Sequence, residues 1–250
     1  MKKIIYIIIL LISTFSMAQN NTLFSQGNSL YNEGKFQDAI HTYERILDTK
    51  NHSAELYFNL ANTYYKLNRI APSVYYYEKA LQLSPNDNDI INNMSFAKNM
   101  TIDDIEIMPE MGFSKIANQV INKYSFDTWA KLSVFFVALF VVLFLAYYFS
   151  YSSTSKRFAF LASILSIVLI LITLAFAFQR YDHEQKDKPA IVFAQESEIK
   201  NEPNLRSEIA FKLHEGTKVQ VLEVYSENWT KIKLADGKTG WISSEDIKEL

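Results

Sequence analysis

The sequence contains no cysteine, and its charges are nearly balanced, with 25 basic against 27 acidic residues. Without cysteine the chain cannot form a disulfide framework, a thiolate metal site, a cysteine nucleophile or a lipid anchor on cysteine. The formal net charge of −2, with no basic stripe, argues against nucleic-acid binding, because proteins of that class neutralise phosphates with clustered Lys and Arg.

Catalytic motifs are also lacking. The sequence has no phosphate-cradling glycine loop, no zinc-ligand spacing and no G-x-S-x-G nucleophile elbow. Its four histidines, His41, His52, His183 and His214, are scattered over different segments. We therefore expect a protein that is not an enzyme and that holds no metal ion or cofactor.

Two long uncharged runs are present instead. The first lies between Lys131 and Lys156, and the second, residues 158–179, lies between Arg157 and Arg180. At a rise of about 1.5 Å per residue, each run is long enough to cross the roughly 30 Å of hydrocarbon in a bilayer. They predict a transmembrane hairpin with spans at 129–151 and 158–178, and a pair of buried helices in a soluble protein is the alternative. Neither run contains Asp, Glu, Lys, Arg or His, which favours anchors over a transport path.

The N-terminus, residues 1–18, has the order of a secretory signal peptide. Two lysines follow Met1, an apolar core runs from Ile4 to Ile12, and small residues stand at Ser16 and Ala18. An uncleaved anchor helix is the alternative. Either interpretation exports the following region, and the hairpin returns the C-terminal region to the same side. The sequence thus predicts a two-pass protein of the cytoplasmic membrane, with both soluble domains on the periplasmic or exported side and the turn at Lys156 in the cytoplasm.

Residues 22–100 contain an internal repeat. A shift of 34 aligns several identical residues: Asn28 with Asn62, Tyr31 with Tyr65, Tyr43 with Tyr77 and Leu47 with Leu81. A period of this length with helix–turn–helix patterning is typical of tetratricopeptide repeats, and the stretch resembles that family. We expect an all-α solenoid of two units, at about 22–52 and 54–86. A helix over 87–100 is expected to cap the second unit, since a repeat cannot bury its apolar face alone.

Such a solenoid presents a groove that can bind a segment of a partner protein. The first helix of each unit would line it with the residues Asn28, Tyr31, Asn62 and Tyr65. The alternative is that the aromatic residues only pack between helices. Because the asparagines are expected to lie on the groove and not between helices, their replacement is not expected to affect folding.

Residues 101–128 are predicted to be a linker followed by an amphipathic helix. Asp103, Asp104 and Glu106 are interpreted as a solvated charge run, not as metal ligands, because no histidine lies nearby in the sequence. From Phe113 onward apolar residues recur at helical spacing. This helix would lie along the membrane surface and lead to Trp129 at the level of the lipid headgroups.

Periodicity changes from helical to alternating in residues 189–250. Four strands are predicted, at 190–194, 218–224, 229–234 and 239–243. The order of LHEGTKVQVLEV, ENWTKIKLADGKTGWI and SSEDI resembles bacterial SH3-like domains, which implies a small all-β barrel. Trp229 and Trp241 are candidate binding residues, with a place in the core as the alternative. The stretch from Gln195 to Phe211 is predicted to be a long loop, either solvated or involved in specificity.

The complete order of segments predicts a multidomain membrane protein, and it resembles the BatE-type proteins of the bacterial aerotolerance operon. That resemblance implies a membrane-anchored scaffold or adaptor in an envelope complex linked to aerotolerance or stress tolerance. The partners it implies are membrane-complex proteins of the von Willebrand A-domain type, together with the lipid bilayer. The alternative is a cell-wall-binding membrane anchor that acts through the SH3-like domain.

Overall fold

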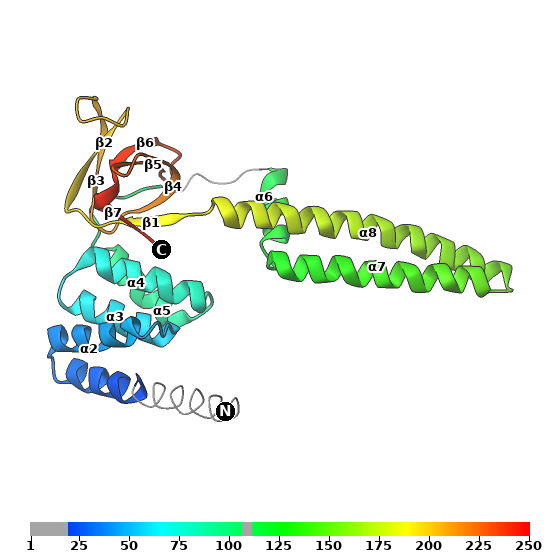
Figure 1. The fold of residues 1–250 in the computed structure, drawn as a ribbon, viewed down its shortest axis with the longest axis horizontal. Helices are drawn as coiled ribbons and strands as arrows, with labels where there is room; N and C mark the ends of the chain where they lie inside the picture. Colours follow the sequence, from blue (N-terminus) through cyan, green and yellow to red (C-terminus); the bar gives the residue numbers. More distant parts are fainter. Residues whose placement is uncertain (1–19, 107–111) are drawn as a thin grey trace, which may run out of the picture. The chain divides into compact units, whose positions relative to one another are not determined.

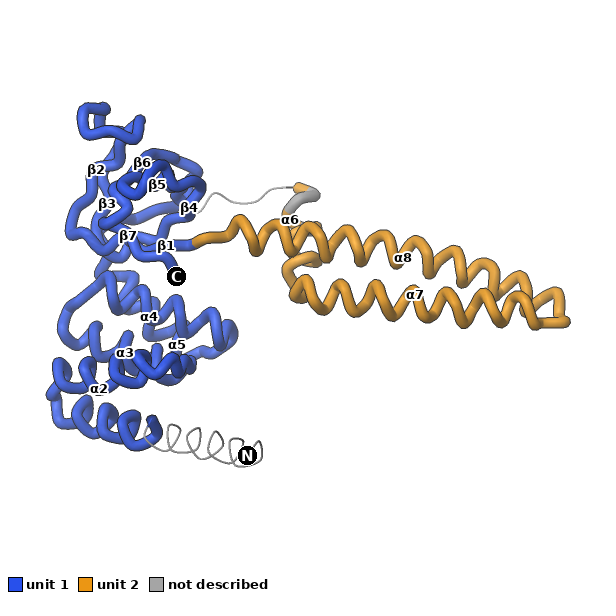
Figure 2. The backbone as a smooth tube through the Cα atoms, viewed as in Figure 1, with its two compact units in different colours: residues 1–107, 189–250 blue, residues 108–188 orange. Residues whose placement is uncertain are grey.

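The structure, a computed structural model, describes residues 20–106 and 112–250 (Figure 1). The chain forms two compact units: residues 1–107 together with 189–250 make up the first, and residues 108–188 make up the second (Figure 2). The second unit is thus inserted in the sequence of the first. Each unit is described separately below.

The helical half of the first unit consists of consecutive helices. The first covers residues 20–32, and the next are α2 (Phe36–Asp48), α3 (Ala54–Lys66), α4 (Ile70–Leu83) and α5 (Asn88–Lys98). Ser53 caps α3 by accepting a hydrogen bond from the Leu56 amide, and Asp87 caps α5 by accepting from Asp89 and Ile90. These caps satisfy amides that have no partner within their own helix.

Small and aromatic residues alternate at the contacts between these helices. Ala39, Ala61 and Ala80 are fully buried, and Tyr43 and Tyr77 are buried at the equivalent place in each repeat. A side chain at Gly27 would overlap the Tyr43 ring, so only glycine permits this close approach. The helices therefore pack closely, as the solenoid predicted from the internal repeat requires.

The turns inside the two repeats share one backbone conformation. Gly34 has a φ of 77°, and Asn68, which stands at the equivalent position of the second repeat, has a φ of 57°. Asparagine tolerates this left-handed region better than other residues with a side chain. That tolerance explains how the second unit makes the same turn without glycine.

The C-terminal half of the first unit is a seven-stranded antiparallel sheet. Its strands are β1 (Pro189–Val192), β2 (Glu196–Lys200), β3 (Ile209–His214), β4 (Lys218–Tyr225), β5 (Trp229–Lys233), β6 (Thr239–Ser243) and β7 (Ile247–Glu249). The order in the sheet is β3-β2-β6-β5-β4-β1-β7. One 3₁₀ turn, Ser244–Asp246, precedes β7.

Two predictions about this region are wrong. The sheet is not a closed barrel, because β3 and β7 are free edges that do not pair with each other. At the β3 edge, the carboxylate of Asp103 accepts a hydrogen bond from the His214 amide at 2.7 Å. The stretch from Gln195 to Phe211 is not one long loop, since it contains β2 and half of β3. The buried side of β2, sequence ESEIK, consists of Ser197 as well as Ile199, so the strand lacks a clear pattern of alternating apolar residues.

The helical and strand halves share a hydrophobic seam, which no sequence pattern predicted. Ile191 of β1 is fully buried in a cluster that includes Tyr75, Tyr77 and Ala80. Phe193 packs against the same cluster, and its ring centroid lies 5.7 Å from that of Tyr75. Because burying an isoleucine stabilises a fold by about 1.5–3 kcal/mol, this seam joins the two halves into one folded body.

Charged groups complete the seam. Glu78 of α4 is 8 % exposed and pairs with Lys218 of β4 at 2.7 Å and with Lys98 at 3.4 Å. The two lysines together compensate a carboxylate that would otherwise be costly to bury.

The residues after α5 also belong to the seam. The interpretation of Asp103 as part of a solvated charge run is therefore wrong. Its side chain is 13 % exposed, and its carboxylate accepts hydrogen bonds from the Thr217 hydroxyl at 2.6 Å and from His214. Ile105 packs against the core of the sheet. The connector therefore contributes one polar contact and one apolar contact to the strand half.

The second unit consists of the helices α6 (Phe113–Ile121), α7 (Phe126–Phe149) and α8 (Ser153–Lys186). The helices α7 and α8 are packed side by side and joined by a short turn. Helix α8 extends into polar sequence at both ends of the predicted span at 158–178, and α7 begins before the predicted span at 129–151. Because α8 already begins at Ser153, Lys156 and Arg157 lie in its first turns and not in a loop.

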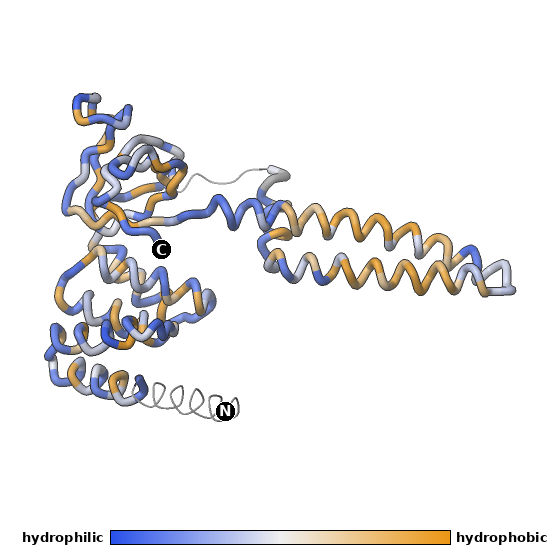
Figure 3. The backbone as a smooth tube through the Cα atoms, viewed as in Figure 1, coloured by the Kyte–Doolittle hydropathy of each residue, from blue (hydrophilic) through white to orange (hydrophobic). Residues whose placement is uncertain are grey.

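Residue types in α7 and α8 are arranged in the opposite way to those of a water-soluble bundle. The buried contact positions are occupied mostly by small and hydroxyl-bearing residues: Ser133, Ala159, Ser163, Ser166, Thr173 and Ala177. Large apolar side chains point outward, as at Phe135, Phe144, Phe158, Leu161 and Leu171. Figure 3 shows the apolar character along both helices. Both are long and apolar enough to cross a membrane, and the small residues allow their backbones to approach closely.

Trp129 is buried within the second unit. It is 8 % exposed, and its indole Nε1 donates a hydrogen bond to the carbonyl oxygen of Ile121 at 3.0 Å. Its ring packs edge-on against Tyr124 and Phe176, with centroids 5.4 Å and 5.1 Å away. Trp129 therefore holds α6 and α8 together at the base of the hairpin, whereas Tyr124 is the more exposed aromatic residue.

Asp103 provides a pH-dependent test of the seam. Burial opposes ionisation, but the hydrogen bonds from Thr217 and His214 outweigh it, so the pKa of Asp103 lies below its ordinary value of 3.8. The carboxylate therefore stabilises the fold above about pH 4, and this contribution is lost as the pH falls through the lowered pKa. We expect Asp103→Asn to speed amide exchange in β3 and β4 at pH 7, with a difference from the native chain that shrinks below about pH 4.

The matched control is Asp104→Asn, because Asp104 is the exposed neighbour. It should leave exchange in β3 and β4 unchanged at both pH values. Equal effects of the two substitutions at pH 7 would contradict the role of Asp103.

Candidate functional site

Two adjacent cavities lie along one face of the repeat. The first has a volume of about 250 Å³ and is lined by Asn28, Tyr31, Asn32, Tyr43, Asn59 and Asn62. The second has a volume of about 160 Å³ and is lined by Tyr31, Asn62, Tyr65, Lys66, Tyr77, Asn93 and Phe96. Because Tyr31 and Asn62 line both, the cavities form one continuous surface, which we call the asparagine groove. It contains all four groove residues expected from the sequence.

The asparagine groove repeats with the period of the sequence. Asn28 accepts hydrogen bonds at Oδ1 from the Tyr43 hydroxyl at 2.7 Å and from Asn59 Nδ2 at 2.9 Å. Asn62 repeats this arrangement in the second unit, accepting from the Tyr77 hydroxyl at 2.5 Å and from Asn93 Nδ2 at 3.0 Å. Each asparagine therefore links three helices of the solenoid.

These contacts correct one expectation about Asn28 and Asn62. They were expected to lie on the groove with no part in folding, yet their Oδ1 atoms satisfy two buried tyrosine hydroxyls. Replacing either by alanine would leave a buried hydroxyl unpaired, which costs about 1–3 kcal/mol. Among the hydrogen bonds within residues 20–106 and 112–250, none is donated by their Nδ2 groups, and both asparagines line the groove.

Burial of the two phenols keeps this arrangement fixed. It raises the pKa of Tyr43 to about 12 and moves the pKa of Tyr77 upward as well. Both hydroxyls therefore remain protonated donors at all physiological pH values. The asparagine carbonyl oxygens are thus permanently occupied, and the amide groups remain available for a ligand.

Tyr31 and Tyr65 supply the aromatic part of the groove. The Tyr31 ring packs edge-on against Phe36, with 5.4 Å between centroids. Phe96 of α5 is 57 % exposed and lines the second cavity beside Tyr65.

The other groove residues, among them Asn59, Asn93 and Phe96, were not predicted from the sequence. Asn59 and Asn93 are themselves separated by one repeat period, so the sequence contained a signal for them. The prediction considered only the first helix of each unit, whereas Asn93 and Phe96 belong to the capping helix α5.

A second candidate surface lies on the outer face of the sheet. Strand register places Tyr225 opposite Trp229, and Lys231 opposite Trp241. The Tyr225 and Trp241 rings meet edge-on with centroids 5.9 Å apart, and the Lys231 ammonium lies 5.6 Å from the centre of the Trp241 ring. We call Tyr225, Trp229, Lys231 and Trp241 the aromatic face. Both tryptophans are half-buried and neither belongs to the core of the sheet.

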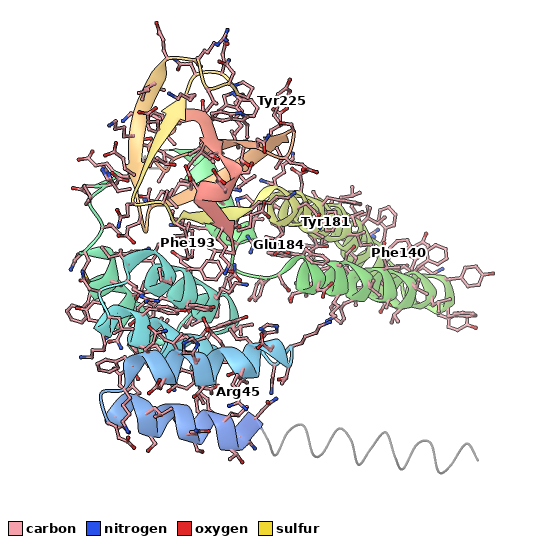
Figure 4. All side chains as sticks on the ribbon, turned by 60° about the vertical axis from the view of Figure 1, so that its left-hand side comes forward. Arg45, Phe140, Tyr181, Glu184, Phe193 and Tyr225 are labelled. Atoms are coloured by element: carbon pink, nitrogen blue, oxygen red, sulfur yellow. The ribbon has the colours of Figure 1, made fainter. Side chains whose placement is uncertain are left out.

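The aromatic face and the seam occupy different sides of the strand half. Figure 4 shows Tyr225 on the side away from the repeat and Phe193 on the side that faces it. Packing of the strands against α4 therefore leaves the aromatic face uncovered within the first unit.

Other polar clusters do not form comparable sites. A larger cavity of about 650 Å³ lies between the connector and β4, but three of its five charged lining residues, Asp103, Lys98 and Lys218, are already paired within the seam. Among the described residues, no three His, Asp or Glu side chains converge in a way that could hold a metal ion.

Two families match parts of the chain. Residues 24–88 match the family described as tetratricopeptide repeat, and residues 198–248 match the family described as bacterial SH3 domain. A search of curated proteins gave no significant match. The two matches confirm the repeat and the SH3-like resemblance predicted from the sequence. Together with the asparagine groove and the aromatic face, they support a scaffold or adaptor role.

Proposed function

We propose that this protein is a membrane-anchored scaffold that binds an extended segment of a partner protein in the asparagine groove. The observation that carries the proposal is the repetition of one unit, an asparagine beside a tyrosine in the lining of the groove, at Asn28 with Tyr31 and at Asn62 with Tyr65. Repeated amide donors suit the repeated carbonyl groups of an extended chain, and the neighbouring rings suit its side chains.

The groove chemistry narrows the class of partner segment. Lys66 is the one charged residue among the side chains that line the two cavities. A groove with a single charged residue favours an uncharged or weakly charged segment recognised through its main chain. The resemblance to BatE-type proteins makes membrane proteins with von Willebrand A domains the proposed partners, in an envelope complex linked to aerotolerance.

The membrane part of the proposal rests on the second unit. Large apolar side chains cover α7 and α8, while small and hydroxyl residues fill their contact. The hydroxyls of Ser163, Ser166 and Thr173 bond to carbonyl oxygens of their own helix, which lowers the cost of placing them in lipid. We therefore propose that α7 and α8 cross the cytoplasmic membrane as a hairpin.

The seam gives an independent argument for topology. The repeat and the strands share a buried core, so both must lie on the same side of a membrane that the hairpin crosses twice. The predicted signal peptide lies outside the described residues. Together with the bacterial SH3 match, it favours the exported side for this shared body.

The natural absence of cysteine provides a direct test of topology. Single substitutions at exposed positions, Asn86→Cys in the repeat, Asn201→Cys in the strand half and Ser155→Cys at the hairpin turn, would be treated with a membrane-impermeant maleimide on intact cells. We expect labelling at residues 86 and 201, and labelling at 155 only after permeabilisation. Labelling of 86 and 201 from opposite sides would refute the hairpin.

The groove is tested by replacing donors without disturbing the fold. Asn28→Asp with Asn62→Asp keeps the oxygen that accepts from Tyr43 and Tyr77 but turns the outward amide into an acceptor. Loss of two hydrogen bonds at about 0.5–1.5 kcal/mol each should weaken partner binding roughly tenfold. The measurement is co-purification of von Willebrand A-domain proteins with the full-length chain from native membranes.

The control for added charge is Asn92→Asp with Asn201→Asp, at two exposed positions outside the groove. It should leave the yield of partners unchanged. Full retention of partners by the Asn28 and Asn62 variant would exclude the groove as the contact surface.

The aromatic face favours a second candidate function, binding of cell-wall material. Exposed Trp and Tyr side chains are frequent in the centre of binding surfaces because they combine large apolar area with few rotatable bonds. This function and the scaffold role are compatible, since the groove and the aromatic face lie on different halves of the first unit.

Sedimentation of the full-length chain with purified cell wall tests this second function. Trp229→Ala with Trp241→Ala should reduce the bound fraction by about tenfold, because each central aromatic residue typically contributes more than about 1 kcal/mol. Leu205→Ala, at a position that is 84 % exposed in the loop after β2, is the control and should bind normally. Unchanged sedimentation of the tryptophan variant, with its melting temperature preserved, would remove the aromatic face from consideration.

A further inference from the structure

A cavity lies at the turn end of the hairpin. It has a volume of about 390 Å³ and is lined by Tyr147 of α7 and by Ser153, Lys156, Arg157 and Phe160 of α8. Two cations, one aliphatic hydroxyl and two aromatic rings therefore face one space. Neither the groove function nor the anchoring function uses it.

The cations of this cavity have no counter-ion among the described residues. None of the ion pairs found among the described residues includes Lys156 or Arg157. The sequence contains no Asp or Glu between Asp127 and Asp182, so the hairpin itself cannot supply one. At the opposite end of the hairpin, by contrast, Arg180 pairs with Glu184 at 2.9 Å and Lys186 pairs with Asp182 at 2.7 Å. Within the described residues, the cations at the turn end are therefore open to an anion from outside the chain.

The surroundings of the cavity are apolar and aromatic. The Tyr147 and Phe160 rings lie 6.0 Å apart between centroids, and both rings are substantially exposed. Exposed aromatic residues continue around this end of the hairpin at Tyr148, Phe149, Tyr151 and Phe158. A free inorganic anion would use the cations alone. A molecule with an anionic head and an apolar tail would use both the cations and the rings.

We propose that Lys156 and Arg157 bind the phosphate group of an anionic phospholipid, with Tyr147 and Phe160 in contact with the start of its acyl chains. The proposal rests on the membrane insertion of α7 and α8 proposed above. Arginine offers paired donors that match phosphate oxygens, and lysine adds a point charge. Basic pockets between membrane helices bind anionic headgroups by this chemistry. The Ser153 hydroxyl is a further donor in reach of the same cavity.

Native mass spectrometry of the full-length protein in detergent tests the site. The protein would be titrated with phosphatidylglycerol and, separately, with phosphatidylcholine of the same acyl chains. We expect the native chain to bind phosphatidylglycerol about tenfold more tightly than phosphatidylcholine. Two cations near a membrane surface attract an anionic lipid with a free energy that corresponds to a ratio of this order. Lys156→Gln with Arg157→Gln should abolish the preference.

The matched control is Lys131→Gln with Lys188→Gln, which removes the same charge at exposed positions away from the turn. It should keep the preference for phosphatidylglycerol. Lys156→Arg with Arg157→Lys retains both charges and should keep most of the preference for phosphatidylglycerol. This variant shows whether substitution at these two positions by itself causes misfolding. A preference that survives Lys156→Gln with Arg157→Gln, or that the control loses equally, would overturn the proposal.

Two further arms separate the possible failures. Glycerol 3-phosphate carries the headgroup chemistry without acyl chains. If it displaces the lipid when both are present at the same concentration, the site binds free phosphate and the lipid assignment is overturned. Alkaline extraction of native membranes reports insertion independently. If the chain resists extraction but shows no lipid preference, the headgroup site fails alone, whereas release of the chain from the membrane refutes the proposed anchoring as well.

Discussion

The first unit depends on one contact, in which Ile191 of strand β1 packs against the tyrosines of α4. This contact joins residues from the beginning and the end of the chain in one core, and it is reinforced by Glu78, which binds Lys98 and Lys218. Without it, the last helix pair of the repeat would expose Tyr75, and Ile191 of β1 would lose its buried environment. The solenoid and the sheet each complete the other's apolar surface.

The asparagine groove follows from the same packing constraint. Tyr43 and Tyr77 must be buried to fill the space beside Gly27 and Ala61, and a buried phenol needs an acceptor. Asn28 and Asn62 supply that acceptor with one end of the side chain and present the other end to the groove. Structural and binding roles are therefore combined in single residues, so replacement by alanine cannot separate them.

Much of this architecture could be predicted from local sequence patterns. The internal repeat predicted the helical solenoid, and the alternation around Trp229 and Trp241 predicted their strands, because both patterns record one repeated environment. The seam could not be predicted in this way. Asp103 and His214 are distant in the sequence and neither belongs to a periodic pattern, so only the folded chain shows that they meet. Strand β2 was missed because Glu and Ser occupy positions where β-branched residues usually mark a strand.

The insertion of the hairpin between Ile105 and Pro189 has a consequence for how the first unit folds. Bringing together two segments separated by a long flexible loop carries an entropic cost that grows with the length of the loop, and such distant contacts slow folding. Here α7 and α8 are antiparallel helices whose ends on the side of α6 are held together by Trp129 and by the bond from Arg180 to Asn122. Once the hairpin has formed, the segments before and after it are no longer separated by the full contour of a flexible insertion.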